Sequence, residues 1–455
     1  MPKFLVSLCL IVVFPGGCNG QPSIPQDVKS NIKERVDRGV TPSIVVGLID
    51  GDSTYYYAYG VKSVETKELA NEHSVYEIGS ISKTFTGILL ANMVVTGKAK
   101  LDDPLQNYLP PGITAPTRNG TAIRLVNLSN HTSSLPRMPD NFPASDPANP
   151  FADYSEKQVY DFLNSYQLTR DVNTQYEYSN YGAGLLGLVL ATKNGKTYEA
   201  FMTDVITKPL GMENTAISLT SDMKRNLALG HQNGKPVSNW DIISLAGAGG
   251  IRSTTVDMIT YVRANMGKTR SDLDPAMELS HKNSRGEGAT PMVGLGWHIN
   301  KSDVGEIVWH NGGTGGYRTF AGFIKGGNKG AVVMTNSVVS IDDIGMHLLD
   351  PKVPLVDPNL PKHKEVDVSA KILEAYVGKY ELMQGFVLTV TLEGNQLSAQ
   401  ATAQPKVPVF AESENVFFYK VVEAQLTFNR NSGGEIESVT LLQNGQKLTG
   451  KRMKD

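Results

Sequence analysis

Apolar runs near the start of the chain predict a core sheet and a buried helix. Residues Ser43–Asp50 form an almost continuous apolar run of strand length, and Thr54–Tyr59 follows after a Gly-Asp turn. This pattern predicts a β-hairpin. A second apolar run, Ile88–Val95, belongs to a segment long enough to form a buried helix. We expect this helix to begin just upstream, near Ser80, and to pack on the sheet.

The middle of the first domain has a different pattern. Between Leu101 and about Lys235 strand-like runs are few, and helical patterns such as Lys157–Asn164 and Tyr181–Thr192 are separated by loops with proline and glycine. We interpret this region as a helical insertion that forms one lobe of a two-lobed domain. Strand-like runs return late, and a final helix near Ile341–Leu349 follows them. These runs are Val293–Ile299, Glu306–His310, Tyr317–Ile324 and Gly330–Thr335. Periodicity alone therefore indicates an α/β or α+β domain.

The composition changes after residue 349. Residues 350–365 contain four prolines in sixteen positions and little apolar patterning, which predicts a linker. A short helix is expected around Ser369–Tyr376, and eight short strand-like runs separated by turns follow between Gly378 and Arg452. Eight short strands with hairpin turns predict a small antiparallel β-barrel. We therefore place a first domain at 21–349 and a barrel domain at 366–455.

The first twenty residues have the pattern of a targeting segment. Lys3 precedes the apolar run Phe4–Phe14, which is too short to span a bilayer and is followed by small residues. Residues 1–20 are therefore predicted to be a secretory signal. The sequence Gly16-Gly17-Cys18 resembles a bacterial lipoprotein processing site, in which a lipid on Cys18 would anchor the chain to a membrane. Ordinary cleavage near Gly20 is the alternative, and either route predicts an exported protein, periplasmic or membrane-anchored.

Composition narrows the possible partners. The 455 residues are 40% hydrophobic and 19% charged, as in soluble globular proteins of two or three domains. A net charge of -2 shows no basic footprint for nucleic acid or for an anionic membrane surface. Both cysteines, Cys9 and Cys18, lie in the targeting segment, so we expect no disulfide in the mature chain. The eight histidines show no metal-binding spacing, so we expect no metal and no cofactor.

Ser80 and Lys83 form the main candidate catalytic pair. Three residues apart on a helix, their side chains share one face, with about 5–6 Å between Cβ atoms. A lysine whose pKa falls on burial can take the proton of a serine hydroxyl. After attack on a carbonyl, the oxyanion can accept the serine's own backbone N–H at the helix N-terminus. The alternative is a helix-capping Ser80 and a solvated Lys83. The flanking Gly79, the apolar helix and the motifs downstream favour catalysis.

The segment Tyr76–Thr86 resembles the active-site serine region of class C β-lactamases and of related D-Ala-D-Ala peptidases and esterases, with Tyr76 where phenylalanine is common. The resemblance implies an α+β fold (α/β sandwich). In this fold an antiparallel sheet, built from both ends of the domain and flanked by helices, carries a helical insertion lobe. Residues 366–455 resemble the lipocalin-like accessory domain behind some serine hydrolases of this type. They contain no candidate catalytic set, so we expect a scaffold, a cover or an oligomerisation module.

The resemblance supplies a second motif, Tyr178-Ser179-Asn180, before a glycine-containing helix. It implies that Tyr178 is the general base for the serine and then the general acid to the leaving nitrogen, with its pKa lowered by cationic neighbours. Asn180 is expected to hydrogen-bond the substrate amide and Lys83. His131, in the segment 124–136, is interpreted as a structural histidine that holds its loop by hydrogen bonds.

The third motif is His310-Asn311-Gly312, where class C β-lactamases usually carry Lys-Thr-Gly. A histidine offers the substrate carboxylate a positive charge only part of the time near neutral pH. The resemblance assigns His310, Asn311, Gly312 and Gly313 to substrate binding. The glycines allow a backbone N–H, that of Gly313, to serve as the second oxyanion donor. Arg318 is a further candidate for carboxylate binding, with a surface salt bridge as the alternative.

Together these residues predict an exported serine hydrolase that forms an acyl-enzyme at Ser80. The expected substrate is a β-lactam amide, and the alternatives are a D-amino-acid peptide (D-Ala-D-Ala carboxypeptidase or D-aminopeptidase activity) or an ester. No deacylating glutamate of the class A type is identifiable, so deacylation is assigned to Tyr178 and a water. A non-catalytic penicillin-binding sensor is the competing class. The presence of Ser80, Lys83, Tyr178 and Asn180 together argues against that class.

Overall fold

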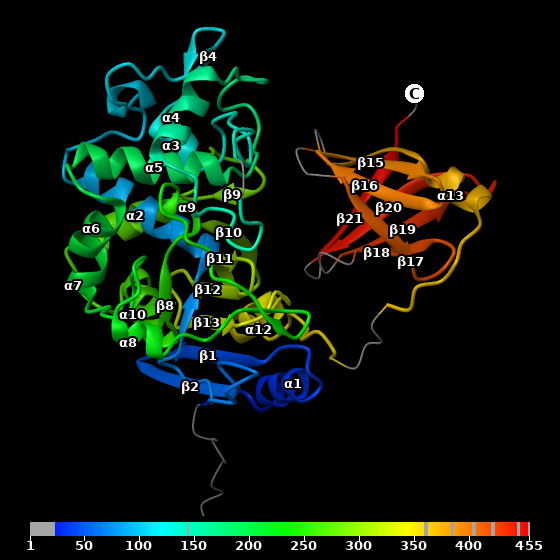
Figure 1. Cartoon of the computed structure of the whole chain (residues 1–455), viewed down its shortest axis with the longest axis horizontal. Coiled ribbons are helices and arrows are strands. Elements are labelled where there is room, and N and C mark those ends of the chain that lie inside the picture. The colour runs from blue at the N-terminus through cyan, green and yellow to red at the C-terminus, as the bar shows by residue number, and fades with distance from the viewer. Residues whose placement is uncertain are drawn as a thin grey trace, which may run out of the picture.

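The computed structural model describes residues 23–453, apart from 143–144, 359–362, 384–385, 403–405, 420–423 and 444–445. The chain forms a mixed domain of helices and sheet, followed by a β-barrel (Figure 1). The predicted signal segment and Cys18 lie outside the described residues. Within the part of the chain that the structure covers, we find no helix with the length and apolarity needed to cross a bilayer.

A seven-stranded sheet forms the centre of the first domain, in the order β2-β1-β13-β12-β11-β10-β9. All its pairs are antiparallel, and β1 pairs with β13 from Ile44 opposite Thr335 to Asp50 opposite Lys329. The strands from both ends of the domain therefore meet in one sheet, which confirms the predicted fold. Their bounds are β1 Ser43–Asp50, β2 Ser53–Gly60, β9 Met292–Val293, β10 His298–Ser302, β11 Gly305–Gly313, β12 Arg318–Ile324 and β13 Lys329–Thr335.

Both faces of this sheet are covered, which explains why β1 is almost continuously apolar. Val45 belongs to the large core formed with α2 (Ser82–Val95) and α10 (Thr255–Asn265). Ile44 and Val46 point to the opposite face and pack in a second core with α1 (Gln26–Asp37) and α12 (Asp342–Leu349). Successive side chains of a strand alternate between the two faces, so a sheet buried on both sides needs apolar residues at every position. The sheet fixes the position of α2, whose first turn carries Lys83.

The helical lobe is built between β3 (Val75–Glu77) and β8 (Arg252–Thr254), which pair with each other. Its centre is α5 (Asn180–Lys193), an apolar helix that contacts α2 and α9. The other elements are η2 Leu105–Tyr108, α3 Leu125–Ser129, α4 Glu156–Ser165, α6 Tyr198–Met202, the π-helical stretch η3 Thr203–Thr207, α7 Lys208–Leu210, α8 Ser221–Arg225 and α9 Ala246–Gly249, with two-residue strands β4 Thr117–Arg118, β5 Thr121–Ala122, β6 His231–Gln232 and β7 Lys235–Pro236. α11 (Asp274–Ser280) follows α10 and contacts α2. The predicted helices at 157–164 and 181–192 are thus present.

The second unit is a closed barrel of eight antiparallel strands, preceded by α13 (Ala370–Tyr376). The last strand pairs back with the first, with Tyr380 opposite Arg452. Side chains fill the barrel: Leu426 is fully buried, and the rings of Tyr376 and Phe428 stack with centroids 4.2 Å apart. Closure leaves no unpaired edge among the barrel strands that the structure describes. The strands are β14 Gly378–Met383, β15 Phe386–Glu393, β16 Gln396–Ala401, β17 Val407–Ala411, β18 Val416–Tyr419, β19 Ala424–Arg430, β20 Ile436–Gln443 and β21 Gln446–Arg452.

Candidate active site

The turn that carries Ser80 lies directly before α2. Gly79–Ile81 form a single 3₁₀ turn (η1), and Lys83 lies in the first turn of the helix that follows. Lys83 Nζ lies 3.0 Å from Ser80 Oγ and donates to the carbonyl oxygen of Ala248 at 2.7 Å. The Lys83 side chain is buried, whereas Ser80 is half-buried and borders a hollow. The predicted pair therefore forms, with the hydroxyl accessible and the amine enclosed.

Burial holds the pKa of Lys83 well below its usual 10.5, and the positive charge of Arg137 lowers that pKa further. Removing an ammonium from water disfavours its charged form, so a lysine enclosed in this way favours the neutral amine. A neutral amine 3.0 Å from the hydroxyl can accept the serine proton. The Lys83 side chain is thus suited to activate Ser80 as a nucleophile.

Tyr178 reaches the same centre from the segment before α5. Its hydroxyl neighbours Ser80, which acts to lower its pKa, and Lys83 Nζ lies 4.8 Å from the centroid of its ring. His131 Nδ1 accepts a hydrogen bond from the backbone N–H of Ser179 at 3.1 Å, and its ring packs 4.4 Å from that of Tyr178. His131 therefore holds this loop in place, as interpreted from the sequence.

The expected pKa of Tyr178 was wrong in direction. Burial raises the pKa of Tyr178 to about 12, although the hydrogen bond to Ser80 and the charge of Arg137 act in the opposite sense. The cost of burying a phenolate outweighs both stabilising neighbours. The phenol is protonated near neutral pH, so Lys83 is the better candidate for the base and Tyr178 is suited to donate a proton.

Asn180 is the first residue of α5 and lines the hollow in front of Ser80. Its Nδ2 donates to Met138 Sδ at 3.8 Å, and its backbone N–H donates to the carbonyl of Arg137. The described hydrogen bonds of Lys83 go to Ser80 and Ala248, so the expected contact between Asn180 and Lys83 is not formed here. The position of Asn180 remains suitable for contact with a substrate amide.

Two glycines allow strand β11 to approach the Ser80 turn. Gly79 has φ +51°, and a Cβ there would lie 2.6 Å from the backbone nitrogen of Gly313. A Cβ on Gly312 would lie 2.0 Å from the carbonyl oxygen of Ile78. Only glycine fits such close backbone approaches. They bring the N–H of Gly313 next to that of Ser80, which is the pair of donors that an oxyanion hole requires.

His310 lies on β11 on the same side as Ser80. Its ring centroid is 6.2 Å from that of Tyr178 and 4.7 Å from that of His298, and its Nδ1 lies 2.5 Å from the carbonyl oxygen of Asn311. Its Nε2 is buried without a hydrogen-bond partner among the described residues. Burial, with the neighbouring His298 and Lys83, holds the pKa of His310 well below its usual 6.5. The expectation of partial positive charge near neutral pH is therefore corrected: the ring is neutral.

Asn311 and Arg318 are not brought into the hollow. Asn311 points to the opposite face of the sheet, where its Nδ2 donates to Asp342 at 2.5 Å. Arg318 pairs with Gly313 across the strands and donates to the backbone carbonyls of Thr314 and Tyr317. Burial raises the pKa of Asp342 to about 6. Alternation along the strands places these residues behind the sheet, while His310 faces the site.

The hollow in front of Ser80 has a volume of about 40 Å³, and much of its lining is apolar. Phe151 and Trp240 line it, with ring centroids 5.4 Å apart. Trp240 is held by Glu77, whose carboxylate accepts its backbone N–H at 2.9 Å and lies 3.5 Å from Arg252. Sequence reasoning missed both aromatic residues, because they come from separate loops and form no motif.

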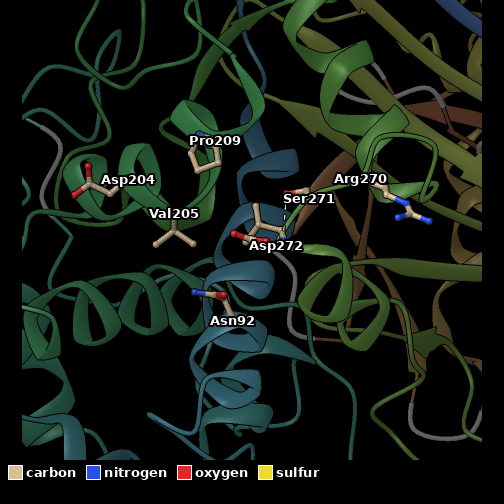
Figure 2. A pocket seen from close by; sticks show the side chains of 8 residues that line it. Asn92, Asp204, Val205, Pro209, Arg270, Ser271 and Asp272 are labelled. Atoms are coloured by element: carbon tan, nitrogen blue, oxygen red, sulfur yellow. Dashed lines mark hydrogen bonds between the residues drawn. The ribbon is translucent and has the colours of Figure 1, made fainter.

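A second cavity of about 500 Å³ lies away from this site, between α2, the π-helical stretch η3 and the loop before α11. Its lining includes Asn92 and Asp272 and contains none of the candidate catalytic residues (Figure 2). Among the residues that the structure covers, no group of three or more His, Cys, Asp or Glu side chains is placed to hold a metal ion.

The fold and the Ser–Lys–Tyr centre define a serine hydrolase built on a sheet with a helical lobe. Comparison with known proteins gives the family: the Beta-lactamase family model matches residues 28–347, so the chain belongs to that family. A model described as a domain of unknown function, DUF3471, matches residues 362–452. The chain is a serine hydrolase of the β-lactamase and D-alanine-carboxypeptidase type.

The relatives of this chain include proteins named as D-alanyl-D-alanine carboxypeptidases and proteins named as β-lactamases. The chain is 30% identical over 334 residues to the D-alanyl-D-alanine-carboxypeptidase/endopeptidase AmpH of Escherichia coli (strain K12), covering 70% of this chain and 86% of AmpH. It is 26% identical over 372 residues to a β-lactamase of the same strain, covering 73% and 94%. The crystal structure of a β-lactamase/D-alanine carboxypeptidase from Yersinia pestis is 25% identical with a TM-score of 0.60, covering 69% and 92%.

Proposed function

We propose that this protein is an exported hydrolase that cleaves D-alanyl peptide and β-lactam amides through an acyl-enzyme at Ser80. The observation that carries the proposal is the 3.0 Å contact between Ser80 Oγ and the buried Nζ of Lys83, whose pKa is lowered by its enclosure. The phenol of Tyr178, which neighbours the same serine, completes the set of proton-transfer groups.

The proposed reaction has two halves. Lys83 Nζ takes the proton of Ser80 as Oγ attacks the substrate carbonyl, and the oxyanion accepts the backbone N–H groups of Ser80 and Gly313. The protonated Tyr178 gives its proton to the leaving nitrogen when the C–N bond breaks, and the proton on Lys83 then restores the phenol. A water next attacks the acyl carbonyl and gives a proton to Lys83 Nζ, and the bond to Ser80 then breaks as Oγ takes that proton back.

One comparison favours D-alanyl peptides over β-lactams as the substrate. AmpH, a D-alanyl-D-alanine carboxypeptidase/endopeptidase by name, is 30% identical to this chain over 86% of the AmpH length. β-Lactams are the second candidate, because a β-lactam carbonyl can acylate the same serine and β-lactamases of 24–28% identity are among the relatives.

The test compares three substrates on one enzyme. Purified protein is incubated with a tripeptide ending in D-alanyl-D-alanine, with a fluorescent penicillin and with a chromogenic cephalosporin. We expect D-alanine release and a lasting penicillin label, both lost in Ser80→Ala and both retained in Ser165→Ala, a substitution on the outer helix α4. Rapid cephalosporin hydrolysis without a lasting label would favour the β-lactamase alternative. Cleavage of simple aryl esters alone, with neither signal, would overturn the proposal.

We also propose roles for the signal segment and for the barrel. The predicted signal segment 1–20 would take the enzyme to the compartment in which peptidoglycan lies, and a lipid on Cys18 would hold it at a membrane. The described interior of the barrel is packed with side chains such as Phe417 and Leu426, which supports a scaffold or cover over a ligand-binding role. Fractionation of cells that express the full chain, with and without Cys18→Ser, tests the anchor.

A further inference from the structure

The hollow in front of Ser80 lacks a fixed positive charge on its described lining. Lys83 is enclosed and favours the neutral amine, and burial keeps His310 neutral. Arg318 lies behind the sheet and is bonded to backbone carbonyls. A peptide that ends in D-alanine carries a carboxylate one residue from the bond that is cut. A carboxylate left without a cationic partner near an apolar hollow would bind poorly.

Arg137 lies next to Tyr178 and next to Asn180, and Asn180 lines this hollow. Its guanidinium carbon lies 5.2 Å from the centroid of the Tyr178 ring, in cation–π range. Its backbone carbonyl accepts the N–H groups of Asn180 and Tyr181 at 3.0 and 3.2 Å. The backbone of Arg137 is thus tied to the first turn of α5, beside Asn180, which lines the hollow. The Arg137 guanidinium thus lies beside the Tyr178 ring, on a backbone that is tied to α5.

The guanidinium of Arg137 is free to bind an anion. The residue is exposed, and no carboxylate among the described residues forms an ion pair with it. Its charge reaches the catalytic groups, since it lowers the pKa of Lys83 and opposes the rise in the pKa of Tyr178. The planar fork of a guanidinium matches a carboxylate with two parallel hydrogen bonds. Arg285, the other arginine nearby, lies over Tyr176 and donates to the carbonyl of Pro291.

We propose that Arg137, on the loop bonded to the first turn of α5, binds the carboxylate of the substrate and supplies the charge that His310 does not provide. This inference rests on the proposed function, because it names the group that recognises the end of the peptide. It also predicts that the enzyme selects for a free C-terminal carboxylate. Arg137 has no part in the proton transfers at Ser80.

The test measures selectivity for the carboxylate. kcat/KM is compared for a tripeptide ending in D-alanyl-D-alanine and for the same tripeptide with a C-terminal amide. In Arg137→Gln we expect kcat/KM for the acid to fall about 10- to 100-fold, chiefly through KM, as is typical for loss of a hydrogen bond to a charged group. The ratio between acid and amide should approach one. Arg137→Lys should recover part of the ratio.

A matched control and two contrary outcomes complete the design. Arg225→Gln, at the end of α8 and paired with Asp222, should leave the ratio at its wild-type value. If Arg137→Gln keeps the wild-type ratio while the peptide is still cleaved, the assignment of Arg137 is wrong and the proposed function stands. If the wild type neither cleaves the peptide nor takes the penicillin label, the proposed function fails and the carboxylate site fails with it.

Discussion

Substitution Gly312→Ala tests whether close backbone approach builds the oxyanion hole. An alanine Cβ at this position would lie 2.0 Å from the carbonyl oxygen of Ile78 and 2.3 Å from Thr319 Oγ1. Ordinary carbon contacts begin near 3.4 Å. The end of β11 must therefore move away from the Ser80 turn by more than 1 Å, and the N–H of Gly313, one residue further along, must move with it.

The expected loss follows from this displacement. A misplacement of about 1 Å at a reacting centre costs on the order of 10²-fold in rate, and loss of one oxyanion donor costs about 10²–10³-fold. We therefore expect kcat/KM in Gly312→Ala to fall about 100- to 1000-fold, which corresponds to about 3–4 kcal/mol of transition-state stabilisation. The rate of acylation should fall with it, because the first tetrahedral intermediate uses the same donors.

The assay is the rate of fluorescent penicillin labelling, with D-alanine release as the second readout. Thermal unfolding is measured on the same samples, so that a variant that fails to fold is recognised. Gly433→Ala in the barrel is the control, since its Cβ would meet only a side-chain oxygen of Asn431 at 3.3 Å. Labelling of folded Gly312→Ala within threefold of the wild-type rate would refute the assignment of the second donor to Gly313.

Four further changes have defined outcomes. Because Lys83 must be neutral to act as the base, kcat/KM should rise with pH through its lowered pKa, and Lys83→Arg, which stays charged, should lose about 10²–10⁴-fold at every pH. Tyr178→Phe removes the proton donor and should lower kcat by about 10²–10⁴-fold while the pH limb of Lys83 persists. Asp342 has a folded pKa of about 6, above its usual 3.8, so its stabilising contribution is complete below pH 3.8 and is lost as pH rises to about 6. That loss amounts to at most about 3 kcal/mol, and urea unfolding should show it in the wild type and not in Asp342→Asn. Leu426→Ala, at a fully buried barrel position, should lower the free energy of unfolding by about 2–5 kcal/mol in a denaturant titration.

The elements that position the site follow from local patterns in the sequence. The run Ser43–Asp50 is almost continuously apolar, which predicts a strand with both faces buried, and β1 is buried on both sides. The glycine-containing apolar segment after Asn180 became α5, capped by Ser179, whose hydroxyl oxygen accepts the N–H of Gly182. The hairpin turns after residue 378 are sufficient to predict an eight-stranded barrel, which the structure contains. Each of these predictions depends on residues that are close together in the sequence or on a regular spacing of apolar residues. Both features can be found in a single sequence.

The electrostatic state of the site could not be predicted in the same way. The pKa of Tyr178 depends on how completely other segments exclude water from its ring, and that enclosure is absent from the motif itself. The placement of Asn311 can be predicted from the sequence. Adjacent strand residues point to opposite faces, so a strand that directs His310 into the site directs Asn311 away from it. Phe151, Trp240 and Arg137 belong to loops whose paths only the folded chain defines.

The pairing of β1 with β13 has a consequence for how the enzyme matures. Ile44 finds its partner in Thr335, and strand β11, which carries His310 and the Gly313 donor, is inserted between the late strands. Contacts so distant along the chain form slowly, because a long loop must be closed before any of them is gained. A chain that folds as it emerges from its N-terminus would thus contain Ser80 early but remain inert until the final strands arrive. Maturation would then be all-or-none, and fragments that end before residue 335 would possess neither the complete sheet nor reactivity toward an acylating substrate.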